Sequence, residues 1–162
     1  LPFGPGDRAP TPTGSVILQV LQGKAKNWWK GGVCLVDVRD VARGHILAME
    51  KGRIGESYCL TNTEANMSSK ALIEMVGRIA GIDGVATREL PPKVLLRAAR
   101  LMELWSKVTG KAPMTTYKNT VYILQENFVD SSKAVRELGM PQSPIEQAIE
   151  DSISWFRENG YV

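Results

Sequence analysis

The sequence predicts an α/β fold, and three observations support this class. Short apolar runs alternate with longer amphipathic segments along the 162 residues. Glycine and proline mark most boundaries between these segments. The chain is 43% hydrophobic and 23% charged, proportions that suit a globular domain with a sizeable core. We therefore expect strands interleaved with helices in a single folded region.

The first third of the chain should contain one strand and two helices. Residues 1–13 hold four of the nine prolines and are expected to form a loop, and 14–21 a short helix. The apolar run 33–36 predicts a strand buried on both faces. A helix should cover 38–51, ended by Gly52, with an inward face that comprises Val38, Val41, Ala42, His45, Ile46 and Met49.

The middle of the chain continues this alternation. Residues 57–60 indicate a second buried strand. Ser68 is the expected N-cap of a helix that runs to residue 80 and stops at Gly81. A short strand at 87–90 then leads into Pro91-Pro92, a pair typical of a helix start.

The helix expected over residues 93–108 is unusually apolar. Its charged residues Arg97, Arg100, Glu103 and Lys107 exclude a membrane-spanning segment. Burial in the core is the simplest interpretation. An apolar pocket or a subunit contact is the alternative.

The last third should be helical. We expect a helix over 116–126, an extended piece at 128–130, and a small helix capped by Asp130 or Ser131 that ends at 138–139. The final helix has the signature of a capping box, which consists of Ser143, Pro144 and Glu146.

Composition narrows the possible partners. The net charge is only +3, so we expect no nucleic acid partner. One histidine and two distant cysteines, Cys34 and Cys59, do not suggest a metal site; buried free thiols in a reducing cytoplasm are favoured over a disulfide. Neither an 18-residue apolar stretch nor a signal peptide is found, so we expect a cytoplasmic protein without a membrane partner. Assembly into a homo-oligomer is left open.

Two interior strands are too few for a stable parallel sheet. Something must cover or extend them, and the chain opens at Leu1 on a turn-rich segment without an initiator Met. We therefore expect that these residues come from a longer protein.

Three groups of segments carry a family resemblance. The first is Gly-Pro-Gly-Asp at 4–7 with Pro-Thr-Pro-Thr-Gly at 10–14, and the second is Leu-Val-Asp-Val-Arg-Asp-Val-Ala at 35–42, with His45 and Ala48 behind it. The third is Phe-Val-Asp-Ser-Ser-Lys-Ala at 128–134, followed by 137–139, 144–146 and 155–156. Their order resembles the second half of extended short-chain dehydrogenases (the NAD-dependent epimerase/dehydratase family), especially dihydroflavonol-reductase-like proteins and hopanoid-associated sugar epimerases.

This resemblance implies the carboxy-terminal part of a Rossmann-type enzyme with a small, mostly helical substrate-binding domain. Residues 33–62 would add strands and a helix to the Rossmann sheet, and 63–162 would form most of the substrate domain. NAD or NADP would be bound mainly by an absent amino-terminal half, because the glycine fingerprint for its pyrophosphate is missing here.

The family's catalytic pair is a tyrosine followed four residues later by a lysine that lowers its pKa. Residues at that spacing after the tyrosines here are Asn62, Val121 and Glu126, and the chain ends after Tyr161. We therefore expect no catalytic residue in this chain and no catalysis by it alone.

The resemblance also implies binding residues. Pro2 and Phe3 would pass the nicotinamide ring. Thr11 and Thr13 would lie on the substrate side, with a stiff loop that caps the helix as an equally weighted alternative.

Other candidates have simpler structural roles beside the functional one. Asp37 suits an N-cap, with substrate contact as the alternative. His45 suits a buried, hydrogen-bonded imidazole better than a proton shuttle. Trp28 and Trp29 should point to opposite faces if extended, so that one packs inward and the other stacks on a substrate; we select Trp28. Met102 and Trp105 are further substrate candidates.

The expected substrate is an apolar small molecule. Nucleotide-sugar epimerases of this family carry arginines and an aromatic residue that anchor a sugar nucleotide, where this chain has Val33, Thr120 and Asn127. We therefore predict the substrate-binding half of an NAD(P)-dependent oxidoreductase that acts on a carbonyl or hydroxyl group. Part of a sugar epimerase or dehydratase is one alternative. A non-catalytic ligand-binding or regulatory module is another.

Overall fold

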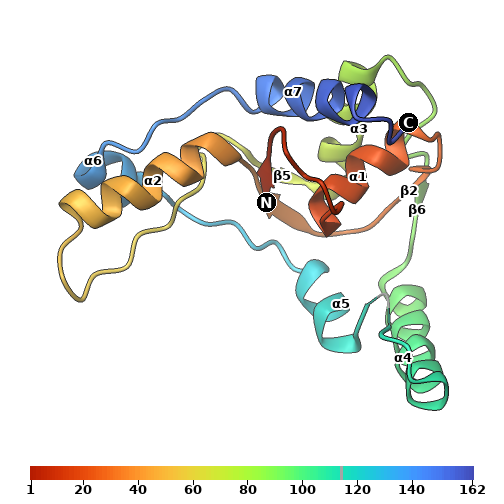
Figure 1. Ribbon diagram of the computed structural model, residues 1–162. Helices are drawn as coiled ribbons and strands as arrows, with labels where there is room; N and C mark the ends of the chain where they lie inside the picture. Colours follow the sequence, from red (N-terminus) through yellow and green to blue (C-terminus); the bar gives the residue numbers. More distant parts are fainter. Residues whose placement is uncertain (114) are drawn as a thin grey trace.

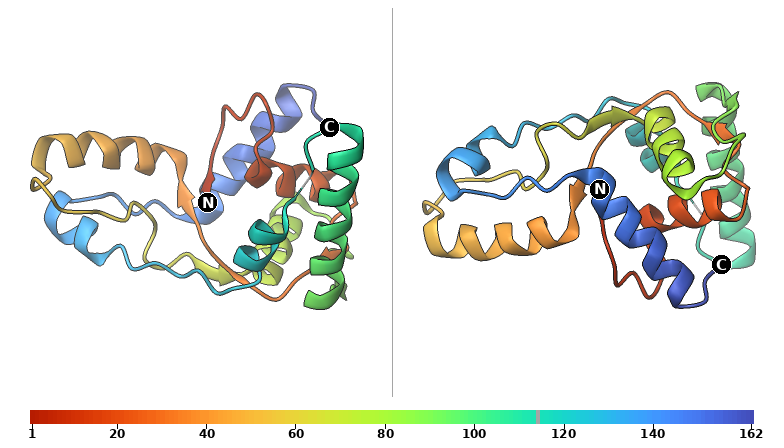
Figure 2. Two further views of the ribbon diagram at one scale, coloured as in Figure 1. Left: turned by 90° about the horizontal axis from the view of Figure 1, so that it is seen from below. Right: turned by 90° about the horizontal axis from the view of Figure 1, so that it is seen from above.

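The computed structural model describes residues 1–113 and 115–162. Its elements lie in three neighbouring regions (Figure 1). A central region holds helices α1 (Pro12–Leu21), α3 (Ser69–Ala80) and α7 (Ile145–Glu158). Helices α2 (Val38–Lys51) and α6 (Ser132–Leu138) lie on one side of it, and α4 (Pro92–Thr109) and α5 (Tyr117–Ile123) on the other (Figures 1 and 2).

The main hydrophobic core lies where α1, α3 and α7 meet. Ile17, Val76 and Ile149 are completely buried there, and Phe156 nearly so. The local signals for α3 act as expected: the Ser68 hydroxyl accepts a hydrogen bond from the Ala71 N–H, and Gly81 adopts a φ of 70°.

The strands are short and pair two by two. Among the described residues they form three separate two-stranded sheets. The pairs are β1 (Pro2–Phe3) with β4 (Val36–Asp37), parallel; β2 (Asn27–Trp28) with β6 (Arg88–Glu89), parallel; and β3 (Gly32–Cys34) with β5 (Asn66–Ser68), antiparallel. Together with the interleaved helices they confirm the α/β class.

Three expectations about strands need correction. The single strand expected at 33–36 is divided at Leu35, because β3 pairs antiparallel with β5 whereas β4 pairs parallel with β1. Residues 1–13 are not all loop, since β1 and the start of α1 lie within them. Residues 57–60 form no strand, and Ser57 and Cys59 are exposed; no neighbouring segment within the described residues forms a ladder with them.

The bounds of α2 are as predicted, but its inward face is different. The buried residues are Asp40, Gly44 and Leu47, whereas His45 and Met49 are exposed. A second hydrophobic cluster, separate from the main core, explains the different inward face. In this cluster Leu47 of α2 packs with Leu138 of α6. The expectation of a buried imidazole at His45 was therefore wrong.

Helix α4 is also less buried than predicted. Ala99 is its only buried residue, and α5 is the helix that it contacts most. The expected helix 116–126 is confirmed in shorter form, as α5. Within the described residues, none of the helices is long and apolar enough to cross a membrane.

The expected capping box at α7 does not form. Ser143 donates instead to the Asp40 carboxylate, and Glu146 pairs with Arg78 at 2.7 Å. Partners far along the chain thus replace the local ones.

Candidate functional site

A cleft of about 520 Å³ lies where β1, α1, β3 and α5 approach one another. Pro2 and Thr13 line it from the start of the chain, and Asn127 and Val129 from its last third. The rest of the lining is mostly apolar and includes Val16, Trp29, Val33, Val41, Tyr122 and Ile123. The fold thus brings together residues that are more than a hundred positions apart.

No charged side chain is found among the described residues that line the cleft. Its polar side-chain groups belong to Thr13, Thr61 and Asn127, together with the Tyr122 hydroxyl, the Trp29 indole N–H and two thiols. The Thr61 hydroxyl already donates to the Leu35 carbonyl oxygen at 3.2 Å. Such a surface suits an uncharged ligand with few polar groups, because a buried charge without a partner is costly.

Both cysteines line the cleft as free thiols. Cys34 is half-buried; its thiol donates to the Asn127 carbonyl oxygen at 3.0 Å and accepts from the Val129 N–H at 3.0 Å. Cys59 is exposed, which corrects the expectation that both thiols are buried. Within the described residues no group of side chains has the composition of a metal site.

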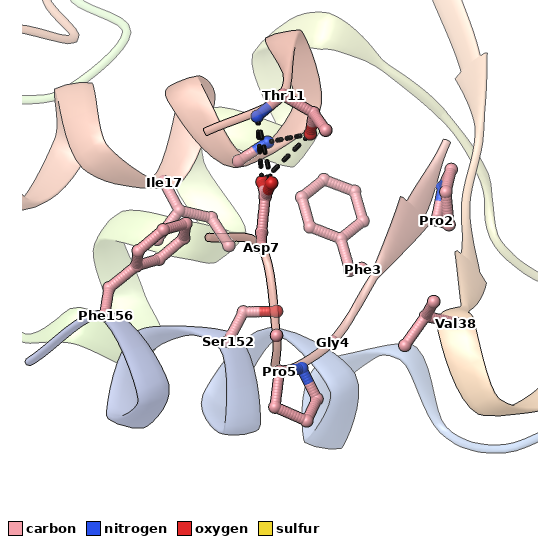
Figure 3. A pocket seen from close by; sticks show the side chains of 12 residues that line it. Pro2, Phe3, Gly4, Pro5, Asp7, Thr11, Ile17, Val38, Ser152 and Phe156 are labelled. Carbon is pink, nitrogen blue, oxygen red and sulfur yellow. Dashed lines mark hydrogen bonds between the residues drawn. The ribbon is translucent and has the colours of Figure 1, made fainter. Parts of the chain in front are cut away.

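A smaller pocket of about 190 Å³ lies beside β1, between α1 and α7 (Figure 3). Thr11 belongs to this pocket, and its hydroxyl is fully engaged. It donates to Asp7 Oδ2 at 2.9 Å and accepts from the Gly14 N–H at 3.2 Å, as the N-cap of α1 (Figure 3). The helix-capping alternative thus describes Thr11, whereas Thr13 faces the cleft.

The two candidate cofactor residues differ in exposure. The Phe3 ring is buried in the main core, with 3% exposure, while Pro2 is exposed and lines both cavities. A ligand at this edge can therefore reach Pro2, whereas Phe3 belongs to the core.

Asp37 is buried and bonded within the protein. Its carboxylate accepts hydrogen bonds from the Arg39 N–H at 2.7 Å and from Arg39 Nε at 2.9 Å, which makes it the N-cap of α2. Burial raises the pKa of this carboxyl group, but the hydrogen bonds and charge of Arg39 outweigh burial and hold its pKa below the ordinary value. Arg39 also pairs with Asp151 of α7 at 2.8 Å. Asp37 is not part of the cleft lining.

The remaining candidates also lie outside the cleft. Trp28 packs against the main core, with Lys70 Nζ 5.5 Å from its ring centroid, while Trp29 faces the cleft. The expected alternation of the two tryptophans is thus seen, but Trp29 is the one in the cleft. Met102 and Trp105 line a separate groove along α4.

Sequence reasoning missed several cleft residues. The alternation of the two tryptophans does not distinguish Trp29 from Trp28, and Tyr122 is marked only as a tyrosine without a lysine four residues later. Val33 and Asn127 are marked only because nucleotide-sugar epimerases carry anchoring residues at these places. No local pattern identifies them together, because β3, α5 and the segment after it meet only in the folded chain.

No protein-family model matches the chain. A protein of Synechocystis sp. named "Putative dihydroflavonol 4-reductase" is 36% identical over 165 residues, which cover 99% of this chain and 47% of that protein. The "Sterol demethylase protein B" of Methylococcus capsulatus is 27% identical and matches 98% of this chain and 48% of its own length. The expected resemblance to the carboxy-terminal half of NAD-dependent epimerase/dehydratase-like, dihydroflavonol-reductase-like proteins is thus confirmed. The chain spans about half the length of the curated relatives that it matches.

Solved structures are similar to this chain over nearly all of its length. The crystal structure of gox2253 has a TM-score of 0.78 and 36% identity over 98% of this chain and 47% of that one. A nucleoside-diphosphate-sugar epimerase from Pseudomonas aeruginosa has a TM-score of 0.75 and 27% identity over 99% and 46%. A UDP-glucuronic acid 4-epimerase from Bacillus cereus, in complex with NAD, shares the fold alone, with 18% identity and a TM-score of 0.63. The expected α/β fold of the carboxy-terminal part of a Rossmann-type protein is thus confirmed.

Proposed function

We propose that this chain forms the substrate side of an NAD(P)-dependent oxidoreductase that reduces or oxidises a carbonyl or hydroxyl group of an uncharged, apolar small molecule. The supporting observation is the cleft, which is mostly apolar and has no charged side chain among its described lining residues. In this proposal Trp29 and Tyr122 supply aromatic walls, and Thr13 supplies a hydroxyl to the ligand.

The cofactor would meet this chain only at its edge. When bound, the nicotinamide cofactor would donate a hydride to a carbonyl group or accept one from an alcohol. Pro2 would lie beside it, with Phe3 behind, since Pro2 is exposed at the cleft and Phe3 is buried. In the same scheme residues 33–62 extend the Rossmann sheet and 63–162 form most of the substrate domain. The free cysteines support a location in the reducing cytoplasm.

A sugar-nucleotide substrate has less support. Val33 and Asn127, where the epimerases carry anchoring side chains, line the cleft without charge, and Thr120 is buried and donates to the Thr116 carbonyl oxygen at 2.9 Å. A pyrophosphate in this cleft would lack the bidentate partners that usually hold it.

The test compares two substrates with the protein in its natural length. With an aromatic ketone, the oxidation of NADPH or NADH would be followed. With UDP-glucose, epimerisation of the sugar would be followed in a separate assay. We expect turnover of the ketone. Val33→Arg should lower its kcat/KM at least about tenfold, because the guanidinium would be buried without a partner.

Val94→Arg is the matched control, because Val94 is exposed on α4, outside the cleft, and its replacement should leave kcat/KM unchanged. Epimerisation of UDP-glucose without turnover of the ketone would contradict the proposal. Saturable binding of the ketone without turnover by either cofactor would instead favour a non-catalytic module.

A further inference from the structure

Helix α4 carries an apolar stripe that nothing in the described structure covers. Leu101, Leu104, Trp105 and Val108 are exposed, Trp105 to 69% and Val108 to 81%. At 3.6 residues per turn these positions share one side of the helix, and Val94 extends the stripe toward its start. Single exposed apolar residues are common, but five on one helix face form a patch that needs a partner.

The stripe lies opposite the face by which α4 is attached. Ala99 is buried, and Glu103 lies near it on the wheel; Glu103 Oε1 accepts a hydrogen bond from the Tyr117 N–H of α5 at 2.8 Å. Helix α4 itself lies at one end of the molecule beside α5 (Figures 1 and 2). The stripe therefore faces away from the helix that holds α4 in place.

Basic side chains border this stripe along one side of the helix, and Arg97 lies within it, between Val94 and Leu101. The residues of α4 include four basic side chains, Lys93, Arg97, Arg100 and Lys107, and a single carboxylate, that of Glu103. The carboxylate is engaged by α5, and the Arg100 guanidinium lies 4.5 Å from the centroid of the Tyr117 ring. Lys93, Arg97 and Lys107 are all exposed. An apolar stripe bordered by long basic side chains is the pattern of helices that lie in the surface of an anionic bilayer.

We propose that α4 docks on an anionic lipid surface, with its apolar stripe in the headgroup region and its lysines and arginines at the phosphates. Charge favours this occupant over a second copy of the chain. Pairing two stripes would gather the basic side chains of both copies around one interface, and the only carboxylate on each helix is already bonded.

Surface docking is compatible with the sequence evidence. The expectation of no membrane partner was drawn from the lack of an apolar stretch long enough to span a bilayer. A helix that lies in the interface needs only an apolar face, and it tolerates charge on its flank. This inference is independent of the proposed oxidoreductase function, because α4 does not line the cleft.

The experiment measures co-flotation of the natural-length protein with vesicles. One set consists of phosphatidylcholine alone, and the other of equal parts phosphatidylcholine and phosphatidylglycerol. We expect binding to the anionic vesicles and much weaker binding to the neutral ones. Lys107→Gln should weaken binding about fivefold. Trp105→Ser should weaken it about tenfold.

Matched controls come from α2. Arg43→Gln and Met49→Ser make the same kinds of change at exposed positions of another helix, and should leave binding unchanged. Far-ultraviolet circular dichroism and NADPH-dependent turnover would confirm that all four variants are folded.

Three outcomes would overturn the inference: no binding of the unsubstituted protein to anionic vesicles, equal loss in the α2 and α4 variants, or equal binding to both vesicle types. A concentration-dependent dimer that Trp105→Ser abolishes would assign the stripe to a second copy instead. Absence of ketone turnover by the unsubstituted protein, with vesicle binding intact, would count against the proposed function and leave this inference standing.

Discussion

The Asp40 carboxylate accepts two hydrogen bonds from Ser143, one from its backbone N–H at 2.7 Å and one from its hydroxyl at 2.9 Å. The two residues are 103 positions apart, and Asp40 is 4% exposed. This contact joins the first turn of α2 to the segment that enters α7. It therefore connects the region of α2 and α6 with the central region.

Asp40→Ala should lower the free energy of unfolding by about 2 kcal/mol, because it leaves the Ser143 N–H without its acceptor. Urea denaturation followed by circular dichroism would measure the change. Asp83→Ala removes an exposed carboxylate and should change the free energy by less than about 0.5 kcal/mol. Equal effects of the two substitutions would show that this contact does not stabilise the fold.

Gly14 has no room for a side chain. A Cβ at this position would lie 2.0 Å from Asp7 Oδ2 and 3.0 Å from Phe156 Cζ. Gly14→Ala should therefore destabilise the protein by about 2 kcal/mol, although alanine is otherwise the better helix former. Thermal unfolding would measure the loss.

The Gly14 contact can be separated from general helix effects. Ser15→Ala, at the next position of α1, should change stability by less than about 0.5 kcal/mol. In an Asp7→Ala background, Gly14→Ala should cost at least about 1 kcal/mol less, because its main obstacle has been removed. Strict additivity of the two substitutions would refute the proposed clash.

Asp37 should make stability depend on pH in the acid range. The pKa of its carboxyl group in the folded protein lies below the ordinary 3.8, so the unfolded chain binds a proton first as pH falls. The stabilisation is complete above that ordinary value and is lost as pH drops through the folded pKa. Asp37→Asn should cost about 1–2 kcal/mol at neutral pH and progressively less below pH 4.

Unfolding free energies measured at several pH values would test this dependence. Asp83→Asn provides the control, since it makes the same substitution at an exposed position and should change stability by less than about 0.5 kcal/mol. A constant difference between wild type and Asp37→Asn across the acid range would contradict the assignment.

The two cleft thiols should react at different rates. Cys59 is exposed, whereas the Cys34 thiol is half-buried and bonded to the backbone at Asn127 and Val129. Iodoacetamide should therefore modify Cys59 about tenfold faster, as peptide mass spectrometry would show. An aromatic ketone bound in the cleft should slow both reactions; faster modification of Cys34 would contradict the described lining.

Helix positions were predictable because their signals are local. Asp37 and Ser68 cap α2 and α3, and Gly52 and Gly81 end them where the sequence indicated. The two residues of β1 carry no periodic pattern, and their pairing with Val36 and Asp37 becomes visible only in the folded chain.

Burial was harder to predict than position. Composition suggested a buried α4, but composition alone does not distinguish a core helix from an exposed one. The inward face of α2 depends on α6, ninety residues later, and on the acceptor that Asp40 provides to Ser143. Asp37 and Thr11 carried functional hypotheses because both are polar residues at helix starts, and in the structure each caps its helix.

The cleft is assembled from distant parts of the chain, which include Pro2, Trp29, Thr61 and Val129. A ligand bound among them would contact segments that only complete folding brings together. It would therefore bind the folded chain and not the unfolded one. A ligand at a hundred times its Kd would raise the free energy of unfolding by about 2.7 kcal/mol. Thermal-shift screening can thus identify the natural compound without any knowledge of the reaction.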